Sequence, residues 1–357
     1  MKSAMTDRPD WRILQKVIVP VAGVLIGMIV GSLVVINKDR SLLMVLGRLF
    51  YNAAGTWSNL ISSLVYTIPL GFTGLAIAFS YSAGIFNIGA EGQLQLGALM
   101  TAVVATSTAF SSSFIQVPVA LIAGAVVGAL WALIPGLLKA YKGFNEIVVT
   151  MLMNYIAILL VNYFLEGPMK APHSFYPQTR PFVKTSWLQD LVPNSDLHYG
   201  FFLLIALFFI VWIVLFKTPL GFKIRAVGFN PEGARYAGIK VKRIMVLSMV
   251  VSGALAGLGG SVEVMGVYRR VAEGFSPGYG FDAIAVALLA NLNPIGVFFS
   301  AFFFGALRNA ASGLQVDLGV PISFIHIVQA LAILFVIASR GLPRQFQNIK
   351  RRLRYGR

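Results

Sequence analysis

Four polar side chains stand in a part of the chain that is otherwise apolar enough for a membrane interior. Residues 81–97 hold Asn87, Glu91, Gln93 and Gln95. Glu91 is the single charged residue between positions 49 and 138, and an ionisable group in hydrocarbon is costly enough to mark a functional site by default. We therefore predict a polar pathway lining that hydrogen-bonds a neutral, hydroxyl-rich solute. The alternative is that the same side chains tie helices together.

Other residues extend this candidate site. Asn154 and Glu263 are polar positions within apolar stretches, where they could face a cavity. Phe86 and Tyr155 could stack a planar base while amide groups bond its edges. We expect Phe86, Asn87, Glu91 and Asn154 to bound one cavity.

A short helix is predicted over residues 281–290. Asp282 suits capping or pairing at its outer end, and Asn291 and Asn293 end it before Pro294 begins the next helix. Solute contact at Asn291 is the alternative to this capping role. Residues 278–296 and 81–97 thus form two Gly- or Pro-interrupted polar segments in the two halves of the chain. Such pairs are the best sequence indication of a transporter's midplane site.

A different chemistry is indicated in the basic loop at 217–243. Asn230 suits a helix N-cap and Pro231 the first helical position. Glu232 complements the positive end of the helix dipole, and Gly238 suits the C-terminal stop. A two-turn helix in a loop between membrane spans can dock in a groove on another protein. A lipid-facing basic loop is the alternative.

The composition restricts the class of protein. Of 357 residues, 57% are hydrophobic and 12% charged, about half the charged fraction of an ordinary soluble domain. The 29 Lys and Arg residues outnumber 13 Asp and Glu, but they stand between apolar runs, which argues against nucleic-acid binding and favours contact with membrane lipid. Cysteine is absent, and no P-loop, HExxH or GxSxG motif occurs. We expect no enzyme activity, no metal site and no cofactor bound by this chain.

Runs of about 20 apolar residues predict membrane-spanning helices. The fold class is therefore all-α, a polytopic membrane protein of about ten spans with interrupted segments. The predicted spans are Val17–Ile36, Leu60–Phe79, 92–110, Val117–Leu138, Ile147–Leu165, Gly200–Phe216, Ile244–Val264, a short one at Phe281–Ala290, Pro294–Ala311 and Pro321–Ser339. Glycines at GxxxG spacing, as in Gly124/Gly128 and Gly253/Gly257, suggest close helix contacts, although 35 glycines make chance matches common.

The distribution of Lys and Arg predicts the orientation. Residues 217–243 and the tail after position 339 hold seven basic residues each, so both are expected in the cytoplasm. We divide the chain into a cytoplasmic N-terminus (1–16), a transmembrane permease domain (17–339) with the loop 217–243, and a basic cytoplasmic tail (340–357). Both termini are then cytoplasmic. The loop at 37–59 conflicts with this scheme because Lys38, Arg40 and Arg48 would lie outside.

Four motifs occur in an order that resembles the permease subunits of type II ABC importers for sugars, nucleosides and branched-chain amino acids. They are GIFNIGAEGQ at 84–93, GFNPEGARYAGIKV at 228–241, SGALAGLGG at 252–260 and GYGFDAIAVALL at 278–289. The four motifs in this order form a strong signature, and the resemblance covers roughly residues 60–340. The sequence NIGAEGQ from Asn87 is similar to that of nucleoside permeases, whereas sugar permeases tend to carry an acidic residue at that position.

The resemblance implies the partners and the mechanism. A second permease subunit, identical or different, would complete the core, with two ATP-binding subunits that use ATP and Mg²⁺ and an extracytoplasmic solute-binding protein. The chain would lie in a bacterial or archaeal cell membrane and import a small polar solute, expected to be a nucleoside, by alternating access. The residues that match the family's coupling helix are Asn230, Pro231, Glu232, Ala234, Arg235 and Gly238. The pathway set is Phe86, Asn87, Glu91, Gln93, Asn154, Tyr155, Glu263 and Asn291.

Three alternatives remain at this stage. A simple-sugar permease fits the same motifs. An ion-coupled secondary transporter would use Glu91, Glu263 and Asp282 as coupling carboxylates. An intramembrane transferase is a distant third.

Overall fold

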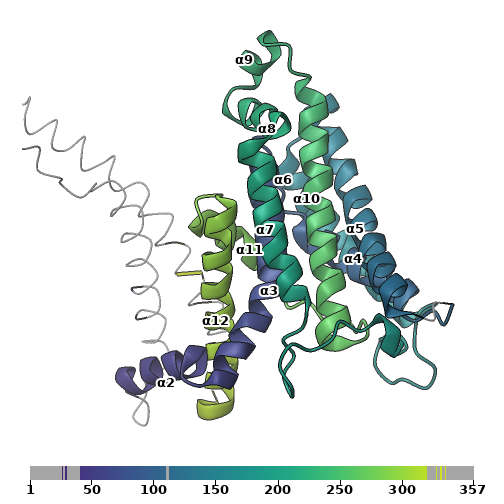
Figure 1. Cartoon of the computed structure of the whole chain (residues 1–357), viewed down its shortest axis with the longest axis vertical. Helices are drawn as coiled ribbons and strands as arrows, with labels where there is room; N and C mark the ends of the chain where they lie inside the picture. Colours follow the sequence, from purple (N-terminus) through teal and green to yellow (C-terminus); the bar gives the residue numbers. More distant parts are fainter. Residues whose placement is uncertain are drawn as a thin grey trace, which may run out of the picture. The chain divides into compact units, whose positions relative to one another are not determined.

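The computed structural model describes residues 41–109 and 112–319, together with positions 26, 29, 327, 330, 331 and 334. In that part of the chain the regular elements are helices (Figure 1). Two isolated β-bridges accompany them, Gln178 with Ala272 and Asp190 with His198. The elements are α2 (Leu42–Ala54), α3 (Trp57–Tyr81), α4 (Ala90–Ala105), α5 (Ser113–Leu137), η1 (Leu138–Lys142), α6 (Glu146–Glu166), η2 (Lys184–Ser186), α7 (Gly200–Lys217), α8 (Pro219–Phe229), α9 (Pro231–Tyr236), α10 (Val241–Glu263), η3 (Val264–Tyr268), α11 (Tyr279–Leu289) and α12 (Pro294–Leu318). One compact unit comprises Trp57–Ala306, and the other comprises the described residues before and after it.

The described residues include six helices long and apolar enough to cross a membrane. They are Trp57–Tyr81, Ser113–Lys142, Glu146–Glu166, Gly200–Lys217, Val241–Tyr268 and Pro294–Leu318. Helices α4 and α11 are shorter, with 16 and 11 residues. The first and last predicted spans lie outside the continuously described segments. An all-α polytopic membrane protein is confirmed, but the count of ten spans is not.

Helix α10 packs against α3, α4 and α5 in the larger unit. Its contact with α5 is made through glycines: a Cβ atom on Gly128 would collide with the carbonyl oxygen of Gly253, and one on Gly257 with that of Gly124. The close approach predicted from the two GxxxG pairs is thus confirmed. Lipid provides no hydrophobic drive between helices, so their association depends on close van der Waals packing, which glycines at the contact allow.

The predicted break after α3 is also present. Residues 82–89 separate Tyr81 from Ala90 without regular structure. Gly84 adopts φ +75° and lies against the backbone of Gly228, so a side chain there would be strained and crowded. The glycine therefore lets the chain turn and bring the polar residues that follow back into the bundle.

The basic loop contains two helices. Helix α9 agrees with the prediction: Asn230 Oδ1 accepts a hydrogen bond from the Gly233 N–H (3.0 Å), Pro231 begins the helix, and Gly238 follows it at φ +79°. The helix α8 before it was not predicted from sequence. Thr218 caps α8 by accepting from the Gly221 N–H (3.1 Å).

The interpretation of residues 37–59 as a loop is wrong for 42–54, where α2 forms. Ser41 caps this helix, and Val45 and Leu49 are buried one turn apart. Within the smaller unit Asn52 Nδ2 donates to Asp317 Oδ2 (3.1 Å) and Asn309 Nδ2 donates to the Asn52 carbonyl (2.8 Å). Thirteen residues are too few for a span, so a search for long apolar runs misses such a helix.

Candidate solute pathway and coupling helix

Asn87 and Gln93 form a reciprocal pair of amides at the start of α4. Asn87 Nδ2 donates to Gln93 Oε1 and to Ser252 Oγ, both at 2.8 Å. Gln93 Nε2 donates back to Asn87 Oδ1 (3.2 Å), which also accepts from the Gly89 N–H (2.9 Å). Ser252 in turn donates to the carbonyl of Ala76 (2.6 Å). One buried network thus joins the break, α4, α10 and α3.

Asn154 connects α6 to the same region. Its Oδ1 accepts from the Gly92 N–H and its Nδ2 donates to the Ile88 carbonyl, both at 2.8 Å. Tyr155 is 53% exposed, so it points away from the buried amides. Phe86 is half-buried and makes an edge contact with Tyr81, with ring centroids 5.7 Å apart. The structure therefore brings Asn154 to the amide network but leaves Tyr155 outside it in this conformation.

Two buried carboxylates meet the first turn of α11. Glu91 Oε2 accepts from the Gly280 N–H (2.7 Å) and Glu91 Oε1 from Gln95 Nε2 (2.8 Å). Tyr279 donates its hydroxyl to Glu263 Oε1 (3.2 Å). The positive end of a helix dipole favours such carboxylates. Glu91 of α4 and Glu263 of α10 therefore both bind residues at the N-terminal end of α11.

The far end of α11 lies apart from this cluster. Asn291 is exposed, at φ +53°, while Asn293 caps α12 by accepting from the Ile295 N–H (3.0 Å) as predicted. Gly278 occupies the cap position of α11, so Asp282 lies in the first turn instead of capping the helix. Gly278 has no side chain that could cap the helix. Its positive φ of +94° explains why glycine occupies this position.

Among the predicted pathway residues, Asn87, Glu91, Gln93, Asn154 and Glu263 are buried. In this conformation the hydrogen bonds described above are made to other groups of the protein. Sequence reasoning missed Ser252, Tyr279 and Gly280 as their partners. Ser252 lies within the motif SGALAGLGG, and Tyr279 and Gly280 lie within GYGFDAIAVALL. Membership of these motifs was the sequence feature that could have indicated the three partners.

Helix α9 presents a polar and aromatic surface. Ala234 is buried and packs α9 against the rest of the protein, whereas Glu232 and Arg235 are exposed. Phe229, the last residue of α8, and Tyr236, the last residue of α9, are 95% and 94% exposed. Figure 1 shows α8 and α9 at one end of the larger unit. Large exposed aromatic side chains beside a capped helix are typical of a protein-binding surface.

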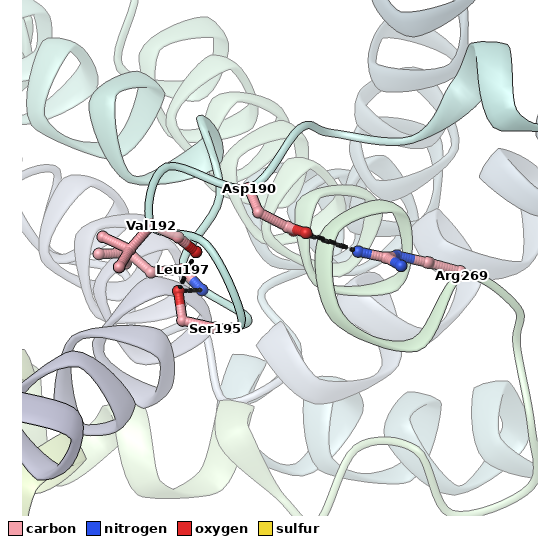
Figure 2. Close-up of polar contacts among 5 residues, drawn as sticks. All are labelled: Asp190, Val192, Ser195, Leu197 and Arg269. Atoms are coloured by element: carbon pink, nitrogen blue, oxygen red, sulfur yellow. Dashed lines mark hydrogen bonds and ion pairs between the residues drawn. The ribbon is translucent and has the colours of Figure 1, made fainter.

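The loop between α6 and α7 lies at the opposite end of the larger unit (Figure 1). Arg269 Nη2 contacts both carboxylate oxygens of Asp190 at 3.1 Å, and its guanidinium lies 4.2 Å from the ring centre of Trp187. Figure 2 shows this ion pair beside a turn in which Ser195 donates to the Val192 carbonyl (2.8 Å). The loop is thus fastened to the end of η3.

His198 is buried, and its backbone forms a β-bridge with Asp190 of this ion pair. Its Nδ1 accepts from the Gly200 N–H (3.1 Å) where α7 begins. Burial lowers the pKa of His198 to about 4, Asp190 opposes this shift and Arg269 adds to it. The imidazole is therefore neutral at pH 7. Among the described residues, no group of three or more His, Asp or Glu side chains could hold a metal ion.

These features define an α-helical membrane protein with a buried polar centre and a short capped helix at one end of its larger unit. The chain belongs to the family described as "Branched-chain amino acid transport system / permease component", which matches residues 59–337. It is a permease subunit of an ABC transporter.

Three relatives match nearly end to end. The guanosine ABC transporter permease protein NupP of Bacillus subtilis is 34% identical over 95% of this chain and 98% of its own length. The glucose ABC transporter permease protein TsgB13 of Haloferax volcanii is 36% identical over 91% and 88%. The nucleoside ABC transporter permease protein NupB of Lactococcus lactis is 35% identical over 90% and 91%.

Proposed function

We propose that this chain is the membrane-spanning subunit of an ABC importer for nucleosides. The observation that carries the proposal is the match of 90–95% of the chain to permeases of guanosine and of nucleosides. The sequence NIGAEGQ from Asn87 is also of the nucleoside type. A nucleoside offers a planar base with amide-like edges and a ribose with hydroxyl groups, which suits the amides of Asn87, Gln93 and Asn154.

Simple sugars are the second candidate because a glucose permease is equally similar, at 36% identity. A sugar would use the same hydrogen-bonding amides but would gain little from Phe86. Competition between a nucleoside and glucose therefore distinguishes the two substrates.

Transport proceeds by alternating access in this proposal. Separate ATPase subunits bind α9 and push on it when they close around ATP. The motion passes through α8 and α10 to the hydrogen-bond network of Asn87, Gln93 and Ser252. The side-chain amides of Asn87 and Gln93 then exchange their hydrogen-bond partners in the protein for the solute. Glu91 and Glu263 hold the first turn of α11 during this movement. The burial of the amides supports a mechanism in which the pathway opens only transiently.

The proposed orientation places α9 and both termini in the cytoplasm and the loop at 167–199 outside. A second permease subunit, the ATP-binding subunits and an extracytoplasmic solute-binding protein complete the transporter. The three relatives come from Bacillus subtilis, Haloferax volcanii and Lactococcus lactis, in keeping with a cell-membrane location.

Uptake into proteoliposomes tests the substrate. The complete transporter is reconstituted with ATP on the ATPase side, and uptake of labelled guanosine is measured with unlabelled glucose or adenosine as competitor. We expect ATP-dependent uptake that adenosine inhibits and glucose leaves unchanged. Inhibition by glucose alone favours the sugar alternative. Uptake that needs an ion gradient instead of ATP contradicts both.

A further inference from the structure

Helix α8 follows the apolar span α7 after a single residue. Thr218 has an extended backbone, with φ −118° and ψ +155°, so it separates the two helices. A Cβ atom on Gly221 would collide with the carbonyl oxygens of Val214 and Leu215, which shows that α8 packs closely against the last turn of α7. Ile224, one turn later, is also buried. One side of α8 is therefore fixed to the membrane-spanning part of the protein.

The remaining surface of α8 combines apolar and basic side chains. Phe222 is 62% exposed, and Lys223 and Arg225 are also exposed. Residues 217–229 contain no Asp or Glu. In the described part of the chain, no ion pair joins Lys217, Lys223 or Arg225 to a carboxylate. A helix with apolar and basic surfaces at the end of a membrane span suits the interface between lipid and water.

The exposed apolar surface of α7 continues onto α8. Phe209, Ile213 and Phe216 are exposed, and their spacing places them on one side of α7. The guanidinium of Arg225 lies 5.1 Å from the ring centre of Phe216. Phe222 stands three positions before Arg225 and so lies on the same side of α8. An apolar strip along α7 thus ends beside a cation of α8.

The direction of the cations favours lipid over a protein as their partner. Lys217 Nζ lies 5.4 Å from the ring centre of Trp212, so it too is held over a ring of α7. Both Lys217 and Arg225 therefore point back along the membrane span instead of toward α9. Lys and Arg at the ends of spans place their apolar stems against hydrocarbon and their charges among lipid headgroups.

We propose that Lys217, Lys223 and Arg225 bind the phosphate of an anionic phospholipid, whose acyl chains lie along the exposed strip of α7. The phosphate supplies the negative charge that these cations lack within the protein, and the acyl chains cover the exposed rings of Phe216 and Phe222. The site does not depend on which solute the permease carries.

The lipid site is connected to the polar centre through α8. A Cβ atom on Gly228, near the end of α8, would collide with the carbonyl oxygen of Ser82 in the break after α3. Gly84 in the same break lies against the backbone of Gly228. The bound lipid therefore anchors the helix against which this break packs, five positions before Ser82 is followed by Asn87.

Native mass spectrometry of the intact transporter tests the proposal. Phosphatidylglycerol and phosphatidylcholine are supplied in equal amounts, and the lipid retained on this chain is identified. The wild type should retain phosphatidylglycerol in preference. In Lys217→Gln/Lys223→Gln/Arg225→Gln, we expect the Kd for phosphatidylglycerol to rise about tenfold or more, because each basic residue near a lipid surface adds to the attraction for anionic lipid.

The matched control removes three other cations from the same end of the larger unit. Lys142, Lys240 and Arg243 are exposed and lie outside α8. Lys242 Nζ lies 5.1 Å from the ring centre of Tyr141, which places these segments side by side. Lys142→Gln/Lys240→Gln/Arg243→Gln should keep the wild-type Kd for phosphatidylglycerol. An equal rise in both triple variants shows attraction by net charge alone and overturns the site.

A second measurement locates the lipid without relying on affinity. Phosphatidylglycerol with a photoreactive group next to its phosphate should label residues 217–229, and phosphatidylcholine with the same group should label them much less. Labelling confined to other segments, or equal labelling by both lipids, overturns the site. If the variant at 217, 223 and 225 loses the ATP-binding subunit but retains phosphatidylglycerol as the wild type does, this surface of α8 binds that subunit and the lipid site is overturned.

Discussion

Glu91 in α4 accepts a hydrogen bond of 2.7 Å from the backbone N–H of Gly280, which lies 189 positions later in the first turn of α11. A Cβ atom on Gly280 would meet the backbone of Ala90 and Glu91, so the two helices touch without room for a side chain. The carboxylate and the glycine together fix where the short helix begins. Glu91 is therefore a structural support of α11 in this conformation, whatever it contacts during transport.

Glu91 variants test this support. Glu91→Ala removes the acceptor for the Gly280 N–H and for Gln95 Nε2, and a buried donor left without its partner costs about 1–3 kcal/mol. Glu91→Gln keeps one carbonyl acceptor and should cost less. We expect the thermal unfolding temperature to fall in the order wild type, Gln, Ala. Equal stability of all three proteins would contradict the inference that Glu91 stabilises the start of α11.

Asn87 variants separate a structural role from contact with solute. Asn87→Leu leaves the polar atoms of Gln93 and Ser252 without their partner, at a cost of about 1–3 kcal/mol. Gln93→Leu breaks the same pair from the other side and serves as the matched variant. We expect both to lower stability and, because the amides are proposed to bind solute, to raise the KM for guanosine uptake. An unchanged KM in folded variants assigns the pair to helix packing alone.

The glycine contacts between α5 and α10 give a prediction about assembly. Gly257→Val places a branched side chain against the carbonyl of Gly124, so the helices must separate and the yield of folded protein should fall sharply. Gly47→Ala is the control, because Gly47 is helical and has open space around its Cβ position. The alanine should leave the folded yield unchanged or raise stability by up to about 1 kcal/mol. A normal yield of folded Gly257→Val would contradict the close contact between α5 and α10.

His198 predicts a pH dependence of the loop at 167–199. Its pKa is about 4 in the folded loop against an ordinary 6.5, so the unfolded loop binds more protons between these values. The stability of the loop should therefore be constant above pH 6.5 and decline by about 3 kcal/mol as the pH falls to 4. Hydrogen–deuterium exchange of residues 183–199, corrected for the intrinsic rate, measures this change.

His198→Asn keeps an acceptor for the Gly200 N–H but does not titrate, and His173 remains in the same loop in both proteins. The variant should lose the decline between pH 6.5 and 4. A decline of equal size in His198→Asn assigns the pH dependence to other groups.

Local signals predicted local structure well. Asn230, Pro231 and Gly238 determine the ends of α9 because each acts within a few residues of its own position. The GxxxG pairs predicted the contact of α5 with α10, since closely packed backbones need glycine at that spacing. Helices α2 and α8 were missed because neither is long enough to read as a membrane span.

Long-range partners were beyond prediction. The acceptor role of Glu91 depends on Gly280, and Asn154 meets the carbonyl of Ile88 on a different segment. Such pairs follow from how the helices pack and not from the types of neighbouring residues. The polar character of the site was therefore predictable, but not which of its groups satisfy one another.

The most direct test of the proposed function is whether α9 binds a separate ATPase. The transporter is purified through a tag on this chain, copurifying proteins are identified by mass spectrometry, and ATP-dependent uptake is measured. Wild type and Lys223→Ala, an exposed change in α8, should retain an ATP-binding subunit. Glu232→Ala/Arg235→Ala should lose both the subunit and uptake while running as the same folded species. A chain that purifies alone and transports without ATP contradicts the proposal that a separate ATPase drives this permease.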